Sequence, residues 1–234
     1  MEEGGLVEAE TGTPQGAIVS PILANIYLHY VLDLWFEKVI KKQSKGYVGI
    51  VRFADDFIIC VEKEEEAKAI LEKLKERLNK FSLELSEEKT RILAFGRNSK
   101  DNGESFNFLG FTYYNAKTRN GHYKVGIKTD KKRLNKALKN MNEWLRKIRN
   151  AFPVNEWWEI LKAKIRGHNQ YYGISGNIRS LKSFFERTKS FVFKWLNRRS
   201  QKKSFNWKTF IKYLEKHPLP KMEIKYSIYT LCQY

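Results

Sequence analysis

Two short apolar segments, separated by only three residues, set the strongest constraint on the fold. Residues 47–53 and 57–61 are rich in β-branched and aromatic side chains, and Ala54, Asp55 and Asp56 lie between them. Runs of this length and composition are typical of strands, and so short a connection joins them into a hairpin. We therefore predict a β-hairpin that carries two adjacent aspartates at its tip.

These two aspartates indicate a metal site. Asp55 and Asp56 repel each other at the end of an apolar sheet, and a divalent cation relieves that repulsion. Hard oxygen ligands of this kind suit Mg²⁺, which takes its other ligands from water and phosphates, so two-metal phosphoryl transfer follows. Aspartate is also a common turn residue for purely local reasons, and the pair alone favours that structural interpretation.

The rest of the chain predicts an α+β fold. Ser20 is expected to cap a helix that has Pro21 at its first position and ends near 41–42. An amphipathic helix follows the hairpin, with apolar residues from Ala67 to Phe81 on one stripe. Further strands are predicted at 91–95, 106–114 and 122–127. From Asp130 the pattern becomes helical, with helices predicted at 130–150, 154–173, 178–199 and 207–216.

Charged residues are unevenly distributed along the chain. Residues 1–104 contain 15 Lys and Arg against 19 Asp and Glu, whereas residues 105–234 contain 29 against 7. Such an excess favours a polyphosphate partner, because each neutralised phosphate releases counterions. The alternatives are an unusually basic soluble domain or contact with anionic lipid. We expect three stretches: 1–128 as an α+β unit, 129–217 as a basic helical domain, and 218–234 as a C-terminal tail.

Aromatic residues lie among the basic residues of the second half. They can stack on bases, although aromatics at helical spacing more often form core, and we expect most of them to be buried. They are Trp144, Trp157, Trp158, Tyr171, Tyr172, Trp195 and Trp207.

Several protein classes are disfavoured. Cys60 and Cys232 cannot build a disulfide framework, so a reducing compartment is expected. No apolar run approaches the roughly 18 residues of a membrane span, and the acidic N-terminus is unlike a signal peptide. We expect no membrane partner.

The order of the motifs resembles the later motifs of group II intron reverse transcriptases. These motifs are Gly12-Thr13-Pro14-Gln15-Gly16, Ser20–Leu28, Arg52-Phe53-Ala54-Asp55-Asp56-Phe57, Glu88-Lys89-Thr90 and Phe108-Leu109-Gly110-Phe111. The basic half, with segments 166–173 and 194–199, is similar to the thumb or maturase domain of that family. The resemblance implies a partial polymerase palm followed by an all-α thumb or maturase domain.

The resemblance also implies roles for individual residues. Asp55 and Asp56 match the catalytic metal ligands, and Lys89 matches a palm lysine that is a candidate proton donor to pyrophosphate; a solvent-exposed lysine is the equal alternative. The positions that match the nucleotide and primer site are Gln15, Gly16, Phe53, Leu109 and Gly110. The cations expected at RNA backbone by the family pattern are Arg166, Lys194, Arg198 and Arg199.

The family pattern is incomplete in this chain. A family palm uses three carboxylates, and the first lies on a strand upstream of the Gly12–Gly16 loop, so the chain is expected to lack it, together with the fingers. Asp33 is not expected to substitute, because it falls within the helix after Ser20. Phe53 stands where the family often has tyrosine, which keeps the ring and loses the hydroxyl.

Two functions remain in competition. The resemblance implies an RNA-directed DNA polymerase that uses Mg²⁺, deoxynucleoside triphosphates, an RNA template and a DNA primer, with an N-terminal palm and fingers fragment or a second copy as partner. The alternative is a non-catalytic, maturase-type module that binds intron RNA and assists splicing. A third interpretation, a palm with other nucleotide chemistry, leaves the Thr13–Gly16 loop without a purpose. Either leading function is expected in a cytoplasmic ribonucleoprotein.

Overall fold

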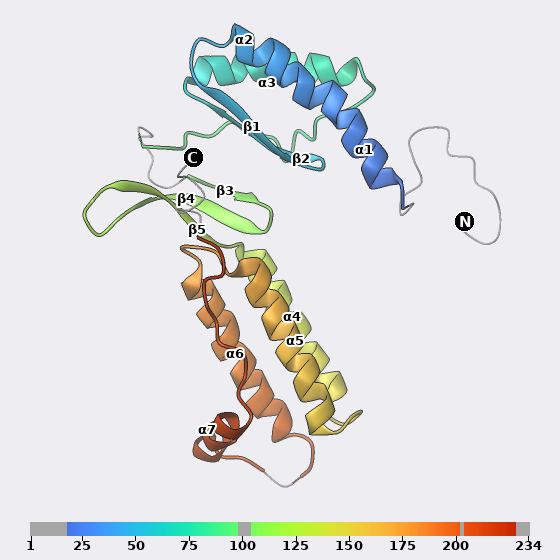
Figure 1. The fold of residues 1–234 in the computed structure, drawn as a ribbon, viewed down its shortest axis with the longest axis vertical. Helices are drawn as coiled ribbons and strands as arrows, with labels where there is room; N and C mark the ends of the chain where they lie inside the picture. Colours follow the sequence, from blue (N-terminus) through green and yellow to red (C-terminus); the bar gives the residue numbers. More distant parts are fainter. Residues whose placement is uncertain (1–17, 98–103, 202–203, 228–234) are drawn as a thin grey trace, which may run out of the picture. The chain divides into compact units, whose positions relative to one another are not determined.

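Two compact units make up the fold, Met1–Ala94 (unit 1) and Phe95–Tyr234 (unit 2). The computed structural model describes residues 18–97, 104–201 and 204–227 (Figure 1). Among the described residues, each unit combines helices with one small antiparallel sheet, which confirms the predicted α+β class. Within the described ranges, none of the helices has the length and apolar character needed to cross a membrane.

The described part of unit 1 begins with one long helical segment. It consists of α1 (Ser20–Leu28), the π-helical turns η1 (His29–Asp33) and η2 (Phe36–Ile40), and α2 (Lys41–Gln43). The predicted cap is wrong by one position, because Ser20 is already helical and Val19 occupies the cap without a side-chain hydrogen bond. Pro21 lies in the first turn, where its missing N–H has no helical partner to lose.

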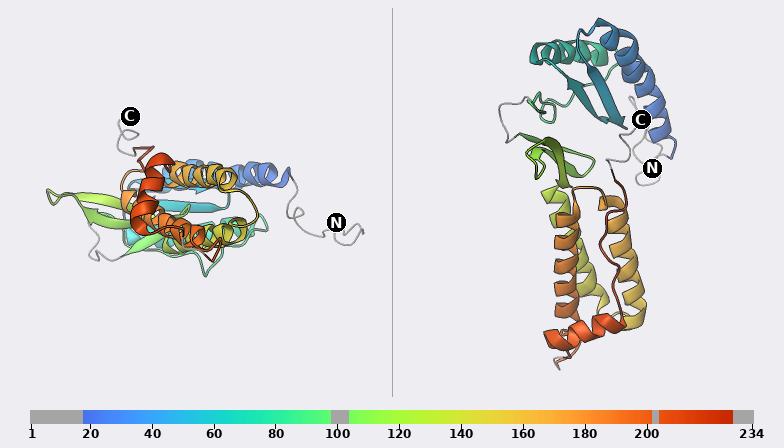
Figure 2. Two further views of the ribbon diagram at one scale, coloured as in Figure 1. Left: turned by 90° about the horizontal axis from the view of Figure 1, so that it is seen from below. Right: turned by 60° about the vertical axis from the view of Figure 1, so that its left-hand side comes forward.

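The predicted hairpin follows this helical segment. Strands β1 (Val48–Phe53) and β2 (Asp56–Val61) pair antiparallel, with Val48 opposite Val61 and Phe53 opposite Asp56. Helix α3 (Glu64–Asn79) comes next and begins with three glutamates, which its N-terminal dipole stabilises. The long helical segment and α3 lie over the same face of the hairpin (Figures 1 and 2).

Apolar side chains between that face and the helices form the core of unit 1. Its fully or nearly buried members come from η1, η2, β1 and α3: Val31, Leu32, Phe36, Ile40, Val48, Ile70, Leu74 and Leu78. Helix α1 contributes no buried residue, and the side chains of Ile22 and Ile26 are more than half exposed.

A three-stranded antiparallel sheet opens unit 2. Its strands are β3 (Ser105–Phe108), β4 (Phe111–Lys117) and β5 (Tyr123–Thr129), in that order. The strand predicted at 91–95 is wrong, since these residues have no regular structure. The strand predicted at 106–114 is instead two strands, because Leu109 and Gly110 adopt left-handed φ angles of 48° and 79° and reverse the chain.

In the described part of unit 2, four helices follow the sheet close to the predicted positions: α4 (Lys131–Ile148), α5 (Val154–Tyr172), α6 (Ile178–Leu196) and α7 (Trp207–Lys216). Helices α4, α5 and α6 run side by side, and α7 lies across their far end (Figures 1 and 2). Asp130 caps α4 by accepting from the Arg133 N–H at 2.9 Å. A capping box at Asn206 and Thr209 fixes the start of α7.

The helices enclose the larger core of the molecule. Its buried residues are Leu138, Met141, Leu145, Trp157, Trp158, Leu161, Ile165, Phe184, Val192, Trp195, Leu196 and Phe210. The expectation that most of the seven interleaved aromatics are buried is too broad. Trp157, Trp158 and Trp195 are buried, whereas the side chains of Tyr171 and Trp207 are about half exposed at 56% and 47%.

Hydrogen bonds tie the sheet of unit 2 to its helices. The Asp130 N–H donates to the Gly110 carbonyl at 3.0 Å, and the Asn177 side chain bonds Thr129. The units divide between Ala94 and Phe95, so the predicted 1–128 stretch includes residues of both units. In the C-terminal stretch 218–227, Tyr226 forms a parallel bridge with Ile174.

Candidate functional site

The hairpin tip presents both predicted metal ligands to solvent. Phe53 pairs with Asp56, so only Ala54 and Asp55 form the turn, and both aspartates are exposed. Ala54 adopts a left-handed φ of 54°, a conformation that strains a residue with a Cβ. Phe53, at the end of β1, is 63% exposed. The tip thus offers two carboxylates and an aromatic ring in and beside one two-residue turn.

Two carboxylates with exposed oxygens fit a hard divalent cation, which binds oxygen ligands and retains water. Within the described residues, the structure contains no group of three or more Asp, Glu, His or Cys side chains placed to share a metal ion. The chemistry of Asp55 and Asp56 therefore fits Mg²⁺ as part of a ligand set rather than as a complete one.

Asp33 is engaged elsewhere. Its carboxylate accepts two hydrogen bonds from Arg52, from Nε at 2.8 Å and from Nη2 at 2.6 Å. These bonds lower the pKa of Asp33 below its usual value, and His29 lies 3.5 Å away on the same helix. Each oxygen of this carboxylate already accepts a hydrogen bond from Arg52, which makes Asp33 less available to a cation at the hairpin tip.

The remaining predicted nucleotide-site residues are dispersed. Gln15 and Gly16 lie outside the described residues. Lys89 lies in an exposed turn, where its N–H donates to the Ser86 carbonyl at 3.2 Å. In the part of unit 1 that the structure describes, no hydrogen bond or ion pair joins the Lys89 side chain to either aspartate of the tip.

The predicted primer-supporting turn is held firmly within unit 2. Besides the Asp130 N–H on Gly110, the Tyr171 hydroxyl donates to the Leu109 carbonyl at 2.9 Å. Phe111, just after the turn, stacks on the Tyr171 ring with centroids 5.9 Å apart. Leu109 and Gly110 thus form a fixed turn against α5, and the half-exposed ring of Tyr171 lies beside them.

The predicted RNA-binding cations lie on two helices. Arg166 is exposed on α5, and Lys194 is exposed on α6. Arg198 is exposed just beyond α6, while Arg199 is half-buried and its Nη1 has no hydrogen-bond partner among the described residues.

Three basic side chains lie close to the ring of Trp195. The charged groups of Arg149, Lys194 and Arg198 lie 4.7, 4.8 and 5.6 Å from the centroid of its ring. Trp195 itself is buried and donates from Nε1 to the Asn142 side chain at 2.8 Å. None of the three cations forms an ion pair with a described acidic residue, so their charge is available to an anion.

Sequence reasoning missed Arg149 in this group. It follows the last turn of α4, where it resembles many other basic helix residues, and only the packing of α4 against α6 brings it to Trp195. A basic residue after the last turn of a helix is the one available signal, and it is weak because cations commonly occur there.

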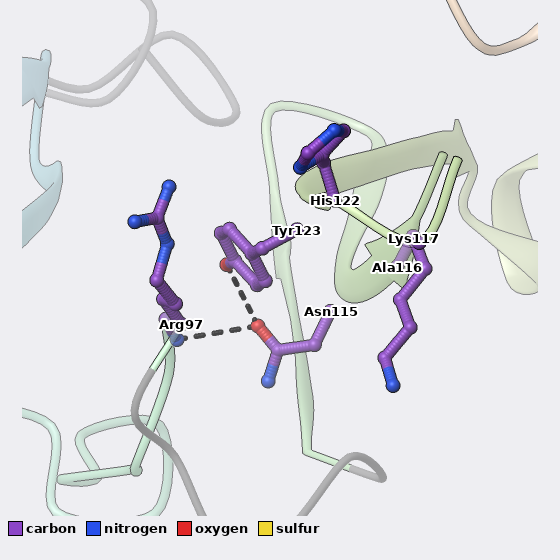
Figure 3. A pocket seen from close by; sticks show the side chains of 8 residues that line it. Arg97, Asn115, Ala116, Lys117, His122 and Tyr123 are labelled. Carbon is purple, nitrogen blue, oxygen red and sulfur yellow. Dashed lines mark hydrogen bonds between the residues drawn. The ribbon is translucent and has the colours of Figure 1, made fainter. Parts of the chain in front are cut away.

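A hollow in unit 2 lies apart from the predicted residues. It has a volume of about 560 Å³ and is lined by Gly96, Arg97, Asn115, Ala116, Lys117, Gly121, His122 and Tyr123. The Asn115 side-chain oxygen accepts from the Tyr123 hydroxyl at 2.9 Å and from the Gly96 N–H at 3.2 Å (Figure 3). None of the predicted catalytic, primer-binding or RNA-binding residues lines this hollow.

Two comparisons with known proteins bear on these residues. Residues 2–113 match the family described as reverse transcriptase (RNA-dependent DNA polymerase). The chain is also similar to the group II intron-encoded protein LtrA of Lactococcus lactis subsp. cremoris, at 27% identity over 256 aligned positions. That alignment covers 74% of this chain and 41% of LtrA, so the chain spans about two fifths of its relative. A second match, to LtrA of strain MG1363, has the same values. The resemblance predicted from the ordered motifs is confirmed.

Proposed function

Because residues 2–113 match a reverse transcriptase domain, we propose that this chain takes part in RNA-directed DNA polymerisation of the group II intron type. The observation that carries the proposal is the exposed Asp55–Asp56 tip of a two-residue hairpin inside the matched region. Two carboxylates at such a turn suit the binding of a divalent cation beside a triphosphate.

Asp55 and Asp56 would hold Mg²⁺, which when bound stabilises negative charge on phosphate oxygens. The substrates would be deoxynucleoside triphosphates, a DNA primer and an RNA template. Phe53 and the Gln15–Gly16 loop would lie beside the incoming nucleotide, and Lys89 would donate a proton to the leaving pyrophosphate. Leu109 and Gly110 would support the primer end, for which a fixed turn is suited.

The third carboxylate of the site would come from a polypeptide corresponding to the upstream palm and fingers, or from a second copy of the chain. In this arrangement unit 1 supplies the palm hairpin and the helices of unit 2 the thumb or maturase surface, within a ribonucleoprotein.

Primer extension on an RNA template tests this proposal. The purified chain in Mg²⁺ is expected to extend a DNA primer, alone or once the upstream polypeptide is added. The Asp55→Asn, Asp56→Asn double variant should lose at least about a hundredfold in rate, since it removes the charge of both ligands. Extension that survives in the double variant would show that these residues are not the metal ligands.

A second function, RNA binding without catalysis, is favoured by a separate observation. Three cations around Trp195 have no acidic partner among the described residues, and residues 105–234 hold 29 Lys and Arg against 7 Asp and Glu. A maturase-type module of this kind would bind structured RNA through phosphate contacts. Its affinity must then fall steeply with salt, and an affinity independent of salt would contradict it.

A further inference from the structure

We propose that Arg52 is a positioning residue that holds the Asp55–Asp56 turn in its metal-binding form, and that Asp33 keeps the charge of Arg52 away from the two aspartates. This inference rests on the proposed function of the turn. It assigns roles to two side chains beyond the predicted ligands themselves.

The first observation is the hydrogen-bond set of the Arg52 guanidinium. Nη1 donates to the Ala54 carbonyl at 2.8 Å and to the Asn25 side-chain oxygen at 2.8 Å. Nε and Nη2 both donate to the Asp33 carboxylate. The side chain of Arg52 is only 12% exposed. Arg52 therefore joins the turn to two successive parts of the long helical segment, α1 and η1.

The second observation is the conformation of the turn. Ala54 holds a left-handed φ of 54°, a conformation that is sterically unfavourable for a residue with a Cβ. A turn of that kind persists only where its surroundings determine it. The bond from Arg52 to the Ala54 carbonyl is such a constraint, and it acts on the residue directly before Asp55.

The third observation is the pairing of charge. A guanidinium three residues before Asp55 would compete with a cation for the aspartates if it were unpaired. The two-bond contact with Asp33 satisfies it with a carboxylate that it fits in a planar fork. Asp33 thus neutralises the charge of Arg52, and the charge of Asp55 and Asp56 remains available to a divalent cation.

The fork geometry makes lysine a poor replacement. Lysine keeps the positive charge but cannot bond a carboxylate through two parallel N–H groups while also reaching Asn25 and Ala54. Arg52→Lys therefore tests position separately from charge, and Asp33→Asn tests charge separately from position.

Arg77 provides a matched control in the same unit. It also anchors η1, because its Nε donates to the Val31 carbonyl at 3.0 Å, and it contacts the Phe81 ring rather than the turn. Arg77→Lys weakens a comparable anchor of the helical segment without touching the hairpin tip.

The experiment is a manganese titration of the full chain labelled with ¹⁵N-alanine, following the broadening of the Ala54 amide resonance. Bound Mn²⁺ at the tip should broaden this resonance in the unaltered chain but not in the Asp55→Asn, Asp56→Asn variant. Arg52→Lys and Asp33→Asn should each raise the Mn²⁺ concentration for half-broadening about tenfold, as is typical when a group supporting a metal ligand is removed. Arg77→Lys should leave that concentration unchanged.

Circular dichroism checks that each variant is folded, and Asp33→Asn carries the test if Arg52→Lys fails to fold. If Arg52→Lys and Asp33→Asn fold and need the same Mn²⁺ concentration for half-broadening as the unaltered chain, the positioning role is overturned and the proposed function still stands. An equal loss in Arg77→Lys would overturn it too, since general loosening of the helix would then suffice. Absence of any broadening in the unaltered chain, both alone and with the upstream polypeptide added, would overturn the proposed function, and this inference with it.

Discussion

His168 shows how burial alone can set the chemistry of one residue. Its ring stacks on Phe184 with centroids 3.6 Å apart, and its Nε2 is buried without a hydrogen-bond partner among the described residues. Burial lowers the pKa of His168 to about 4 from its ordinary value of 6.5. Between about pH 4 and pH 6.5, the folded protein therefore holds a mostly neutral His168 ring, whereas the same ring in an unfolded chain would be mostly protonated.

This difference predicts a pH dependence of stability. Because the folded pKa lies below the unfolded one, the contribution is complete above about pH 6.5 and is lost as the pH falls towards 4. We expect unit 2 to lose about 2 kcal/mol of unfolding free energy from this residue between pH 7 and pH 4.5.

Urea unfolding of the chain and of His168→Phe at both pH values measures the effect. Carboxylates titrate alike in the two proteins, so the difference between their pH dependences isolates His168. If the unfolding free energies of the chain and of His168→Phe changed equally between the two pH values, the lowered pKa of His168 would be contradicted.

At the scale of elements, the ends of α4 and α6 form a candidate RNA contact around Trp195. Arg149→Gln together with Arg198→Gln removes two of the three cations near the ring. If both contact phosphates, the salt slope of RNA affinity should fall by about two, one for each cation removed.

The matched control for this pair is Lys208→Gln with Lys216→Gln, which removes the same charge from exposed positions on α7. Filter binding to a structured RNA over a range of salt concentrations compares the two double variants. Equal changes in slope would show that net charge, rather than the cluster at Trp195, determines binding.

The elements also show what sequence alone could predict. Helices α4 to α7 were predicted to within a few residues, because apolar periodicity, Pro153 and Pro218 define them locally. The 91–95 strand failed because apolar composition does not supply a pairing partner. The residue pattern placed Leu109 and Gly110 inside one strand, because the left-handed turn there is held by distant residues: Tyr171 bonds Leu109 and Asp130 bonds Gly110. The family resemblance, by contrast, indicated a turn at these two residues.

The candidate site, too, could be predicted from the sequence only in part. The position of Asp55 and Asp56 at a hairpin tip followed from two strands and a short connection. The anchoring of that tip by Arg52 did not, because its partners Asn25 and Asp33 lie 27 and 19 residues away in the sequence. Contacts over such separations depend on how the helical segment packs on the hairpin.

At the scale of the whole molecule, each unit has its own core. Leu74 is buried among residues of unit 1, and Leu161 is buried among residues of unit 2. We expect Leu74→Ala to destabilise unit 1 by about 3 kcal/mol with little effect on unit 2, and Leu161→Ala to do the reverse. Hydrogen exchange read by mass spectrometry during urea titration resolves the two units by their peptides. A single transition that both substitutions shift equally would contradict separate cores.

Metal rescue of primer extension shows whether Asp55 is a ligand of a catalytic cation. In a chain with Cys60 and Cys232 replaced by serine, Asp55→Cys should lose extension in Mg²⁺, because a thiolate is a poor ligand for that ion. Adding Mn²⁺ or Cd²⁺ should restore part of the activity to Asp55→Cys and none to Asp55→Ala. Full activity of Asp55→Cys in Mg²⁺ alone, or equal rescue of both variants, would contradict the assignment.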